Sequence, residues 1–123
     1  MKVLIADDDR VLTHLLSTRL RSKGWTVDIA MDAMQVMMYA MRGMPDVITL
    51  DINMPGGTGH EALRKLRASM KTAQIPVLVL SGSIDPQDET RVAELGAEGF
   101  MHKPVEVDEL HERLLGLTGA TTR

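Results

Sequence analysis

The sequence predicts an α/β fold in which a single doubly wound, five-stranded parallel sheet is covered by helices on both faces. Strand-like segments alternate with segments whose apolar residues are spaced as on a helix, and this alternation is typical of βα units. Four of the five strand-like segments are continuous apolar runs, which favours strands buried on both faces of a parallel sheet. The length of 123 residues fits one such domain.

The predicted strands are short and end where polar or small residues begin. In chain order they cover residues 3–6, 26–30, 47–50, 77–80 and, more weakly, 99–102. After the last helical pattern only a few polar residues remain. We therefore expect one domain at residues 1–117 and a short polar tail at residues 118–123.

Helices are predicted between the strands from apolar spacing and from end signals. Apolar residues recur three or four positions apart in the first, third and last helices: Leu12, Leu16 and Leu20; Leu63, Leu66 and Met70; and Val107, Leu110, Leu114 and Leu117. Gly24 stands where a glycine commonly follows a helix, and Asp85-Pro86 predicts the N-cap and first residue of the fourth helix. The second helix is crowded with methionines, which we interpret mainly as core residues and otherwise as an adaptable surface for a partner: Met31, Met34, Met37, Met38, Met41 and Met44.

Composition excludes several classes of protein. Apolar residues make up 44% and charged residues 25%, as in an average globular protein, and no apolar run approaches the ~18 residues of a membrane span. The net charge is −3 and the basic residues form no single block, so direct nucleic-acid binding is disfavoured. The absence of cysteine excludes disulfides and thiolate sites, and it suits a cytoplasmic location.

Polar residues that could support chemistry follow four of the five predicted strands. In open α/β sheets, ligands bind outside the carboxyl ends of the strands, where the strand order reverses. If the order is 2-1-3-4-5, the four strands are neighbours and their polar residues line one crevice with Asp51 at its centre. In strand order these residues are Asp7, Asp8 and Asp9, then Asp51, then Ser81, and then Lys103.

This group of acids predicts a bound cation. Two carboxylates about 4 Å apart repel each other by roughly 4 kcal/mol at an effective dielectric constant near 20, and Lys103 alone cannot neutralise three acids. Hard oxygen ligands without histidine or cysteine favour Mg²⁺, which readily bridges to a phosphoryl oxygen. Mg²⁺, Lys103 and the Ser81 hydroxyl could share the charge of a transferring phosphoryl group, and Asp51 is the natural nucleophile.

Each of these residues also has an ordinary structural interpretation. Asp9 is expected to be only the N-cap of the first helix, and Asp7 or Asp8 alone could be a loop acid. Ser81 alone could be a turn residue and Lys103 a surface charge. Their joint placement at consecutive strand ends is harder to explain by chance. We interpret the scattered histidines as surface or structural residues: His14, His60, His102 and His111.

Four segments in this order and spacing resemble the receiver domains of bacterial two-component response regulators. They are LIADDD at 4–9, LDINMP at 50–55 with Gly59 after it, LSG at 80–82 and FMHKP at 100–104. The resemblance runs from about residue 2 to 117. It implies a flavodoxin-like, CheY-like receiver fold and Mg²⁺-dependent phosphorylation of Asp51. The phosphodonor would be a sensor histidine kinase or a histidine phosphotransfer protein.

The resemblance also assigns a role to each residue of the site. Asp8 and Asp51 would be direct Mg²⁺ ligands, Asn53 would contribute its main-chain carbonyl, and Asp7 would act mainly through a bound water. Ser81 would bind the phosphoryl group and move toward it. These roles describe a signalling switch that assists its own phosphorylation and dephosphorylation, and not an enzyme.

The predicted output is a changed binding face. Lys103 would pair with the phosphoryl group and precede a cis peptide to Pro104, and Phe100 would be the aromatic switch residue that turns inward when Ser81 moves. The fourth helix, fifth strand and fifth helix would then repack and control a downstream partner or output domain. We expect a monomer or a phosphorylation-dependent homodimer, without membrane contact.

Two other functions remain open from the sequence. An aspartate-based phosphohydrolase of the haloacid dehalogenase type would use Asp7 as its nucleophile, because the aspartates at residues 7–9 also contain an acid-x-acid pair. Against this function, such enzymes are expected to place further acids after the strand that carries the lysine and usually need cap elements. Here the extra acid, Asp51, precedes Ser81, and the chain ends soon after Lys103. The other possibility is a degenerate receiver that binds partners without being phosphorylated, which the complete set of acids, hydroxyl and lysine disfavours.

Overall fold

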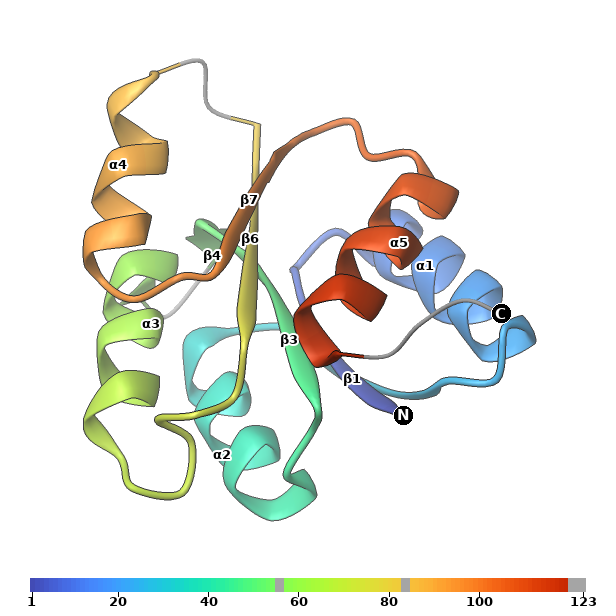
Figure 1. Cartoon of the computed structure of the whole chain (residues 1–123), viewed down its shortest axis with the longest axis horizontal. Coiled ribbons are helices and arrows are strands. Elements are labelled where there is room, and N and C mark those ends of the chain that lie inside the picture. The colour runs from blue at the N-terminus through green and yellow to red at the C-terminus, as the bar shows by residue number, and fades with distance from the viewer. Residues whose placement is uncertain (55–56, 83–84, 120–123) are drawn as a thin grey trace.

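The computed structural model describes residues 1–54, 57–82 and 85–119 and contains the predicted five-stranded parallel sheet (Figure 1). The strand order is β2-β1-β3-β6-β7, and every neighbouring pair is parallel. This is the expected 2-1-3-4-5 order. The strands are β1 (Lys2–Ala6), β2 (Thr26–Ala30), β3 (Val47–Asp51), β6 (Val77–Ser81) and β7 (Gly99–His102).

The strands β4 and β5, which are not part of the main sheet, form a short antiparallel hairpin that the sequence did not predict. It consists of β4 (Asn53–Met54) and β5 (Gly57–Thr58) and follows directly after β3. In this hairpin Asn53 pairs with Thr58. The hairpin brings the start of the third helix back to the end of β3, which matters for the site described below.

Five helices cover the two faces of the sheet: α1 (Arg10–Ser22), α2 (Ala33–Gly43), α3 (Gly59–Ala68), α4 (Gln87–Glu94) and α5 (Val107–Thr118). Figure 1 shows α1 and α5 on one side of the sheet and α2, α3 and α4 on the other. Alternate residues of one strand enter the two cores, so that Leu4 packs with α2 and α3 while Val3 and Ile5 pack with α1 and α5. This two-sided burial explains why the strands are continuous apolar runs.

Most of the predicted helix ends are confirmed. The Asp9 carboxylate accepts hydrogen bonds from the N–H groups of Val11 and Leu12, and so caps α1 as expected. Gly24 has a φ of +96° just after this helix, a conformation that favours glycine. The prediction for α4 was one residue too early, because the helix begins at Gln87 and not at Pro86. Asp85 still accepts a hydrogen bond from the Gln87 N–H at 2.9 Å.

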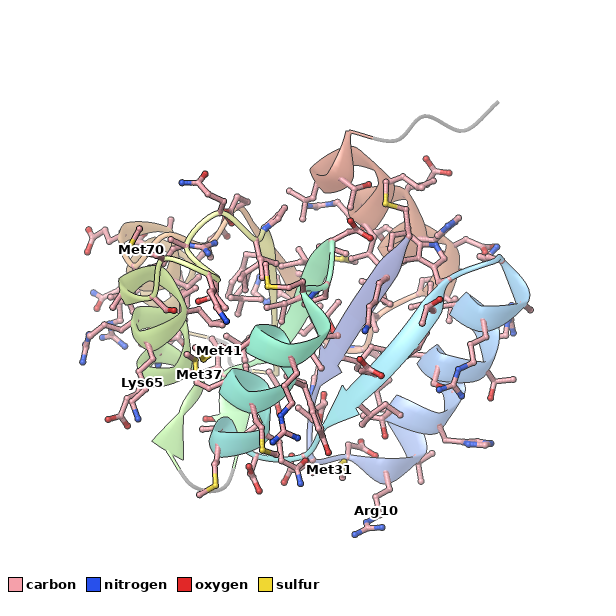
Figure 2. All side chains as sticks on the ribbon, turned by 90° about the horizontal axis from the view of Figure 1, so that it is seen from below. Arg10, Met31, Met37, Met41, Lys65 and Met70 are labelled. Atoms are coloured by element: carbon pink, nitrogen blue, oxygen red, sulfur yellow. The ribbon has the colours of Figure 1, made fainter. Side chains whose placement is uncertain are left out.

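The interpretation of the methionines in and around α2 as core residues was wrong for the three that are exposed. Within α2 the buried residues are Val36 and Ala40, whose small side chains fit against the sheet. Met34, Met41 and Met44 are 77%, 40% and 51% exposed, and of the six methionines Met37 is the one that packs against the core (Figure 2). Three of the six methionines are thus exposed, and the other three, Met31, Met37 and Met38, are partly buried.

No helix in the described ranges combines the length and the apolar character that crossing a bilayer would require. The last helix, α5, extends to Thr118 and is followed by Gly119 in a left-handed conformation. The predicted tail at 118–123 thus begins inside this helix, and its residues 120–123 lie outside the described part of the chain.

Candidate functional site

The carboxyl ends of four adjacent strands bring the predicted site residues to one edge of the sheet. Asp7 follows β1, Asp51 is the last residue of β3, Ser81 is the last residue of β6, and Lys103 follows β7. One carboxylate oxygen from each of Asp7, Asp8 and Asp51 lies within 4.8 Å of the others. The apolar strands thus determine where these acids meet, although the acids are far apart in the sequence.

Hydrogen bonds hold the buried carboxylates in place. Asp7 is 1% exposed and accepts a hydrogen bond from the Asp9 N–H at 2.9 Å. Asp51 is 5% exposed and accepts one from the Asn53 N–H at 3.2 Å. Asp8, in contrast, is exposed. The group therefore combines two fixed, buried acids with one acid that solvent can reach.

Lys103 connects the two buried acids. Its Nζ donates a hydrogen bond to Oδ2 of Asp7 at 2.8 Å and lies 3.5 Å from Oδ2 of Asp51. Its main-chain N–H donates to the Ser81 carbonyl at 2.8 Å, and the Lys103–Pro104 peptide is cis, as the resemblance implies. The backbone of the lysine is thus attached to β6, while its ammonium group reaches across to β1 and β3.

The electrostatics of the site leave Asp51 harder to ionise than an ordinary aspartate. Burial raises the pKa of the Asp51 carboxyl, and the nearby charge of Asp7 raises it further, while the Asn53 N–H and Lys103 oppose this shift in part. Burial alone would lower the pKa of Lys103, but its contacts with Asp7 and then Asp51 outweigh burial and raise it. Lys103 therefore stays positively charged, and the three clustered carboxylates outnumber this single ammonium group.

The donor set fits Mg²⁺. Among the described residues, the three clustered acids offer hard carboxylate oxygens, with neither histidine nor cysteine in the group. Three carboxylates face a single ammonium group, so another cation would reduce the remaining repulsion. The predicted fourth ligand, Asn53, lies two residues after Asp51 and is exposed.

Gly59 supports the site through its lack of a side chain. A Cβ atom at this position would lie 2.6 Å from both the Asp51 carbonyl oxygen and the Ile52 Cα, which is closer than such contacts occur. The Gly59 N–H also donates to the Ile52 carbonyl at 2.6 Å. The sequence motif contains this glycine, but only the hairpin β4–β5 shows why it must be one: α3 begins directly against the strand end that carries Asp51.

The two predicted switch residues lie on neighbouring strands. Ser81 is fully buried and pairs in register with His102 of β7. Phe100 is half-buried on β7, and its ring makes an edge-to-face contact with the ring of His102. In the sequence, this contact is indicated only by the separation of two residues, which places both side chains on one face of the strand.

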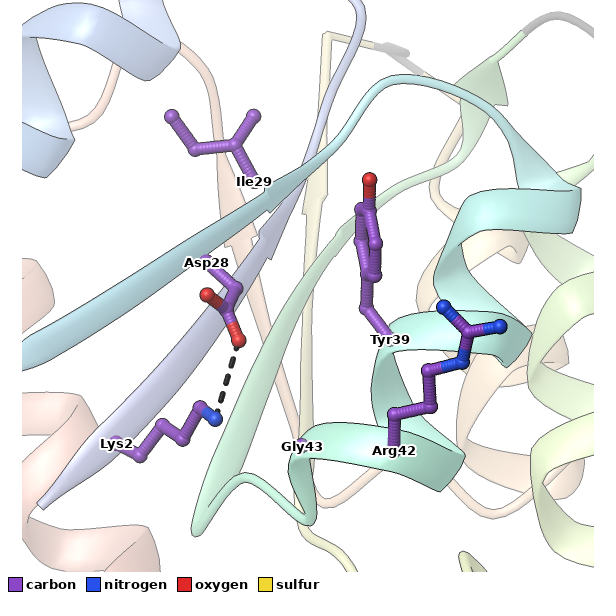
Figure 3. A pocket seen from close by; sticks show the side chains of 6 residues that line it. All are labelled: Lys2, Asp28, Ile29, Tyr39, Arg42 and Gly43. Atoms are coloured by element: carbon purple, nitrogen blue, oxygen red, sulfur yellow. Dashed lines mark ion pairs between the residues drawn. The ribbon is translucent and has the colours of Figure 1, made fainter.

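One hollow of the surface lies away from the acids. It has a volume of about 410 Å³ and is lined by Lys2, Asp28, Ile29, Tyr39, Arg42 and Gly43 (Figure 3). Lys2 lies at the amino end of β1, opposite the end where Asp7 follows, and its Nζ is paired with Asp28 at 3.2 Å. The charges of Lys2 and Asp28 in this hollow already balance each other in part. The acid cluster is therefore the better candidate for a chemical site.

Comparisons with known proteins agree with this geometry. The family model for the response regulator receiver domain matches residues 3–115. The DNA-binding dual master transcriptional regulator RpaA of Synechocystis is 34% identical over 122 residues, which cover 99% of this chain and 51% of RpaA. The chain thus spans about half the length of this curated relative.

Solved receiver domains have the same fold. The receiver domain of the Francisella response regulator 1452 matches with a TM-score of 0.88 and 28% identity, covering 96% of both chains. The receiver domain of the Pseudomonas aeruginosa sensor histidine kinase PA1611, described with a magnesium ion in its active-site cleft, matches with a TM-score of 0.88 and 26% identity, covering 97% of this chain and 98% of that one. These matches do not favour a dehalogenase-type phosphohydrolase. The chain belongs to the family of response regulator receiver domains.

Proposed function

We propose that this receiver domain accepts a phosphoryl group on the Asp51 carboxylate and uses the modification as a signal. The observation that carries the proposal is the meeting of Asp7, Asp8 and Asp51 within 4.8 Å, with the Lys103 ammonium 3.5 Å from Asp51. A buried carboxylate beside a fixed cation and an acidic metal-binding group is the arrangement that aspartyl phosphorylation requires.

In this reaction an Asp51 oxygen attacks phosphorus, a new P–O bond forms, and the bond from phosphorus to the donor breaks. Asp7, Asp8, Asp51 and the main-chain carbonyl of Asn53 would hold Mg²⁺, which when bound supplies positive charge to the phosphoryl oxygens. The Asn53 N–H and the rigid end of β3 orient Asp51. This support keeps the nucleophile in place during in-line attack.

Lys103 and Ser81 complete the binding of the phosphoryl group. Lys103 would pair with a phosphoryl oxygen and leave the Asp7–Asp51 pair, which the metal ion would then compensate. The Ser81 hydroxyl would donate to another phosphoryl oxygen. Asp51, Ser81 and Lys103 are therefore the proposed catalytic group, and hydrolysis of the acyl phosphate at this site would reset the switch.

The proposed partners follow from membership of the family. The phosphodonor would be a sensor histidine kinase or a histidine phosphotransfer protein, in the cytoplasm. Movement of Ser81 and Phe100 would change the face of α4, β7 and α5 that a protein partner or an output domain reads. In this proposal, residues 1–117 form the receiver domain, which is a monomer or forms a homodimer on phosphorylation. We expect no contact of these residues with nucleic acid.

Intact-mass measurement tests the proposal. The protein is incubated with acetyl phosphate and Mg²⁺, with and without a chelator, and compared with Asp51→Asn and with the matched control Asp28→Asn, whose carboxylate lies at the distant Lys2 pair. We expect one phosphoryl adduct in the wild type and the control, and none in Asp51→Asn or without metal. An adduct that survives Asp51→Asn, or steady turnover of a phosphate ester, would contradict it.

A further inference from the structure

Methionines are concentrated in and around α2. Six of the ten methionines of the chain lie within residues 31–44, a segment that contains neither leucine nor isoleucine. The positions of α2 that are fully buried against the core carry Val36 and Ala40 instead. Packing against the sheet therefore does not explain why the exposed apolar positions of this helix carry sulfur.

Met34, Met38 and Met41 form one row along α2. They are four and three residues apart, and at about 3.6 residues per turn they fall within an arc of about 60° on the helix surface, on the side away from Val36 and Ala40. Met34 is 77% exposed, Met41 is 40% exposed, and Met38 is partly exposed. Exposed apolar side chains that gather in one place often mark a binding site.

The spacing of the row allows its three thioethers to reach one point. Side chains three or four residues apart on a helix have their Cβ atoms about 5–6 Å apart. Methionine is unbranched and has three rotatable bonds, so its sulfur atom can change position without any change in the backbone. Met38 lies between Met34 and Met41 in the row and is a neighbour of both. A cation beside Met38 could therefore be bound by all three sulfur atoms.

Sulfur ligands select a different cation from the one that suits the acid cluster. Thioethers are soft ligands that favour Cu⁺, whereas carboxylates favour hard cations such as Mg²⁺. The chain has no cysteine, and its four histidines lie on α1, α3, β7 and α5. On α2 itself, thioethers are thus the soft ligands, with no thiolate or imidazole among them.

We propose that Met34, Met38 and Met41 form a binding site for a soft monovalent cation such as Cu⁺, for which Ag⁺ is a stable substitute. Met37 packs against the core and Met44 is the C-cap of the helix, so neither belongs to the site. This inference goes beyond the proposed phosphorylation of Asp51 and does not depend on it, because the row of methionines exists in the unmodified chain. The two proposals can therefore fail separately.

Methionine methyl resonances test the site directly. The protein is labelled with [methyl-¹³C]methionine and titrated with silver nitrate in a chloride-free buffer. Each methionine contributes one methyl resonance, so the spectrum shows which thioethers bind the ion. The titration is repeated with excess Mg²⁺, which should not displace Ag⁺ from sulfur, and with Cu⁺ under anaerobic conditions.

Leucine substitutions give matched variants, because exchange of methionine for leucine conserves volume. Met34→Leu, Met38→Leu and Met41→Leu are made singly and together. Met70→Leu is the control, since Met70 is 98% exposed but follows α3 and has no other methionine three or four residues away. Fluorescence of the single tryptophan, Trp25, which is buried on the other side of the sheet, verifies that each variant is folded.

We expect a single bound Ag⁺, with the methyl resonances of Met34, Met38 and Met41 shifting together until the site is saturated. Each single substitution should weaken binding about tenfold or more, the triple substitution should abolish it, and Met70→Leu should bind like the wild type. Resonances that shift in order of exposure, with Met70 first, would show contact with separate thioethers and overturn the proposal. Undiminished binding by the triple variant, or displacement of Ag⁺ by Mg²⁺, would overturn it as well.

Discussion

Replacing Asp51 by asparagine should stabilise the metal-free protein, although it removes the proposed phosphoacceptor. The Asp51 oxygens lie within 4.8 Å of Asp7, which corresponds to a repulsion of roughly 3 to 4 kcal/mol at an effective dielectric constant near 20. The attraction to Lys103 at 3.5 Å is of similar size, roughly 5 kcal/mol. Since the two nearly cancel, the decisive contribution is the cost of burying a carboxylate, which asparagine avoids. We expect a gain of about 1 to 2 kcal/mol in the free energy of unfolding.

The gain should depend on pH with a definite sign. The pKa of Asp51 is raised in the folded protein, first by burial and then by Asp7, so folding favours the protonated carboxyl. In the wild type, the Asp51 carboxyl therefore makes its full contribution to the free energy of unfolding below the unfolded pKa of about 4. This contribution is lost as the pH rises through the folded pKa. The advantage of Asp51→Asn should be largest near pH 8 and nearly absent at pH 4. Denaturant unfolding with a chelator present, followed by Trp25 fluorescence, measures the free energies of unfolding of both proteins at pH 4 and pH 8.

Addition of Mg²⁺ should reduce the stability advantage of Asp51→Asn over the wild type. At a metal concentration of ten times the dissociation constant, the wild type gains about 1.4 kcal/mol, whereas Asp51→Asn has lost a ligand and gains less. As a control, Asp28→Asn breaks the partly exposed pair with Lys2 and should lose up to about 1 kcal/mol, with no dependence on Mg²⁺. If Asp51→Asn is less stable than the wild type at pH 8 in chelator, the account of the site as electrostatically unfavourable is wrong.

Four further substitutions test other parts of the structure. Gly59→Ala should lower the free energy of unfolding by about 1 to 3 kcal/mol, measured by denaturant unfolding, because its Cβ would press on the backbone of Asp51. Lys103→Met should destabilise the metal-free protein by roughly 3 kcal/mol, since it leaves Asp7 buried without its ammonium partner, yet titration calorimetry should show tighter Mg²⁺ binding because a competing cation is gone. Met34→Gln and Met41→Gln should each change the free energy of unfolding by no more than about 0.5 kcal/mol, because both side chains are exposed. A larger loss would show that these methionines contribute to the core.

The sheet and the acid cluster could be predicted because both depend on short local patterns. An apolar run followed by a polar residue marks the carboxyl end of a buried strand, and parallel strands bring such ends together whatever their distance in the sequence. Asp7, Asp51 and Lys103 were placed correctly for this reason. The hairpin β4–β5 has only two residues per strand and no pattern of its own, so the contact of Gly59 with Asp51 was not predictable.

The α2 methionines were misplaced because periodicity alone did not show which face of the helix is buried. Methionines occur around much of this helix, and the pattern does not say which of them meets the sheet. Val36 and Ala40 of this helix are fully buried, whereas Met34 is exposed. The contact of His102 with Phe100 was missed for a different reason, since a two-residue separation is shared by many pairs on a strand that never touch.

The same electrostatic imbalance accounts for both the stability and the reactivity of the site. In the free protein the pKa of Asp51 stays above its ordinary value, chiefly because of burial and then because of Asp7. Lys103 compensates the charges of Asp7 and Asp51 only in part. A bound cation would relieve the repulsion and leave Asp51 ionised, which is the form that attacks phosphorus. Lys103 would then be free to move to the new phosphoryl oxygens.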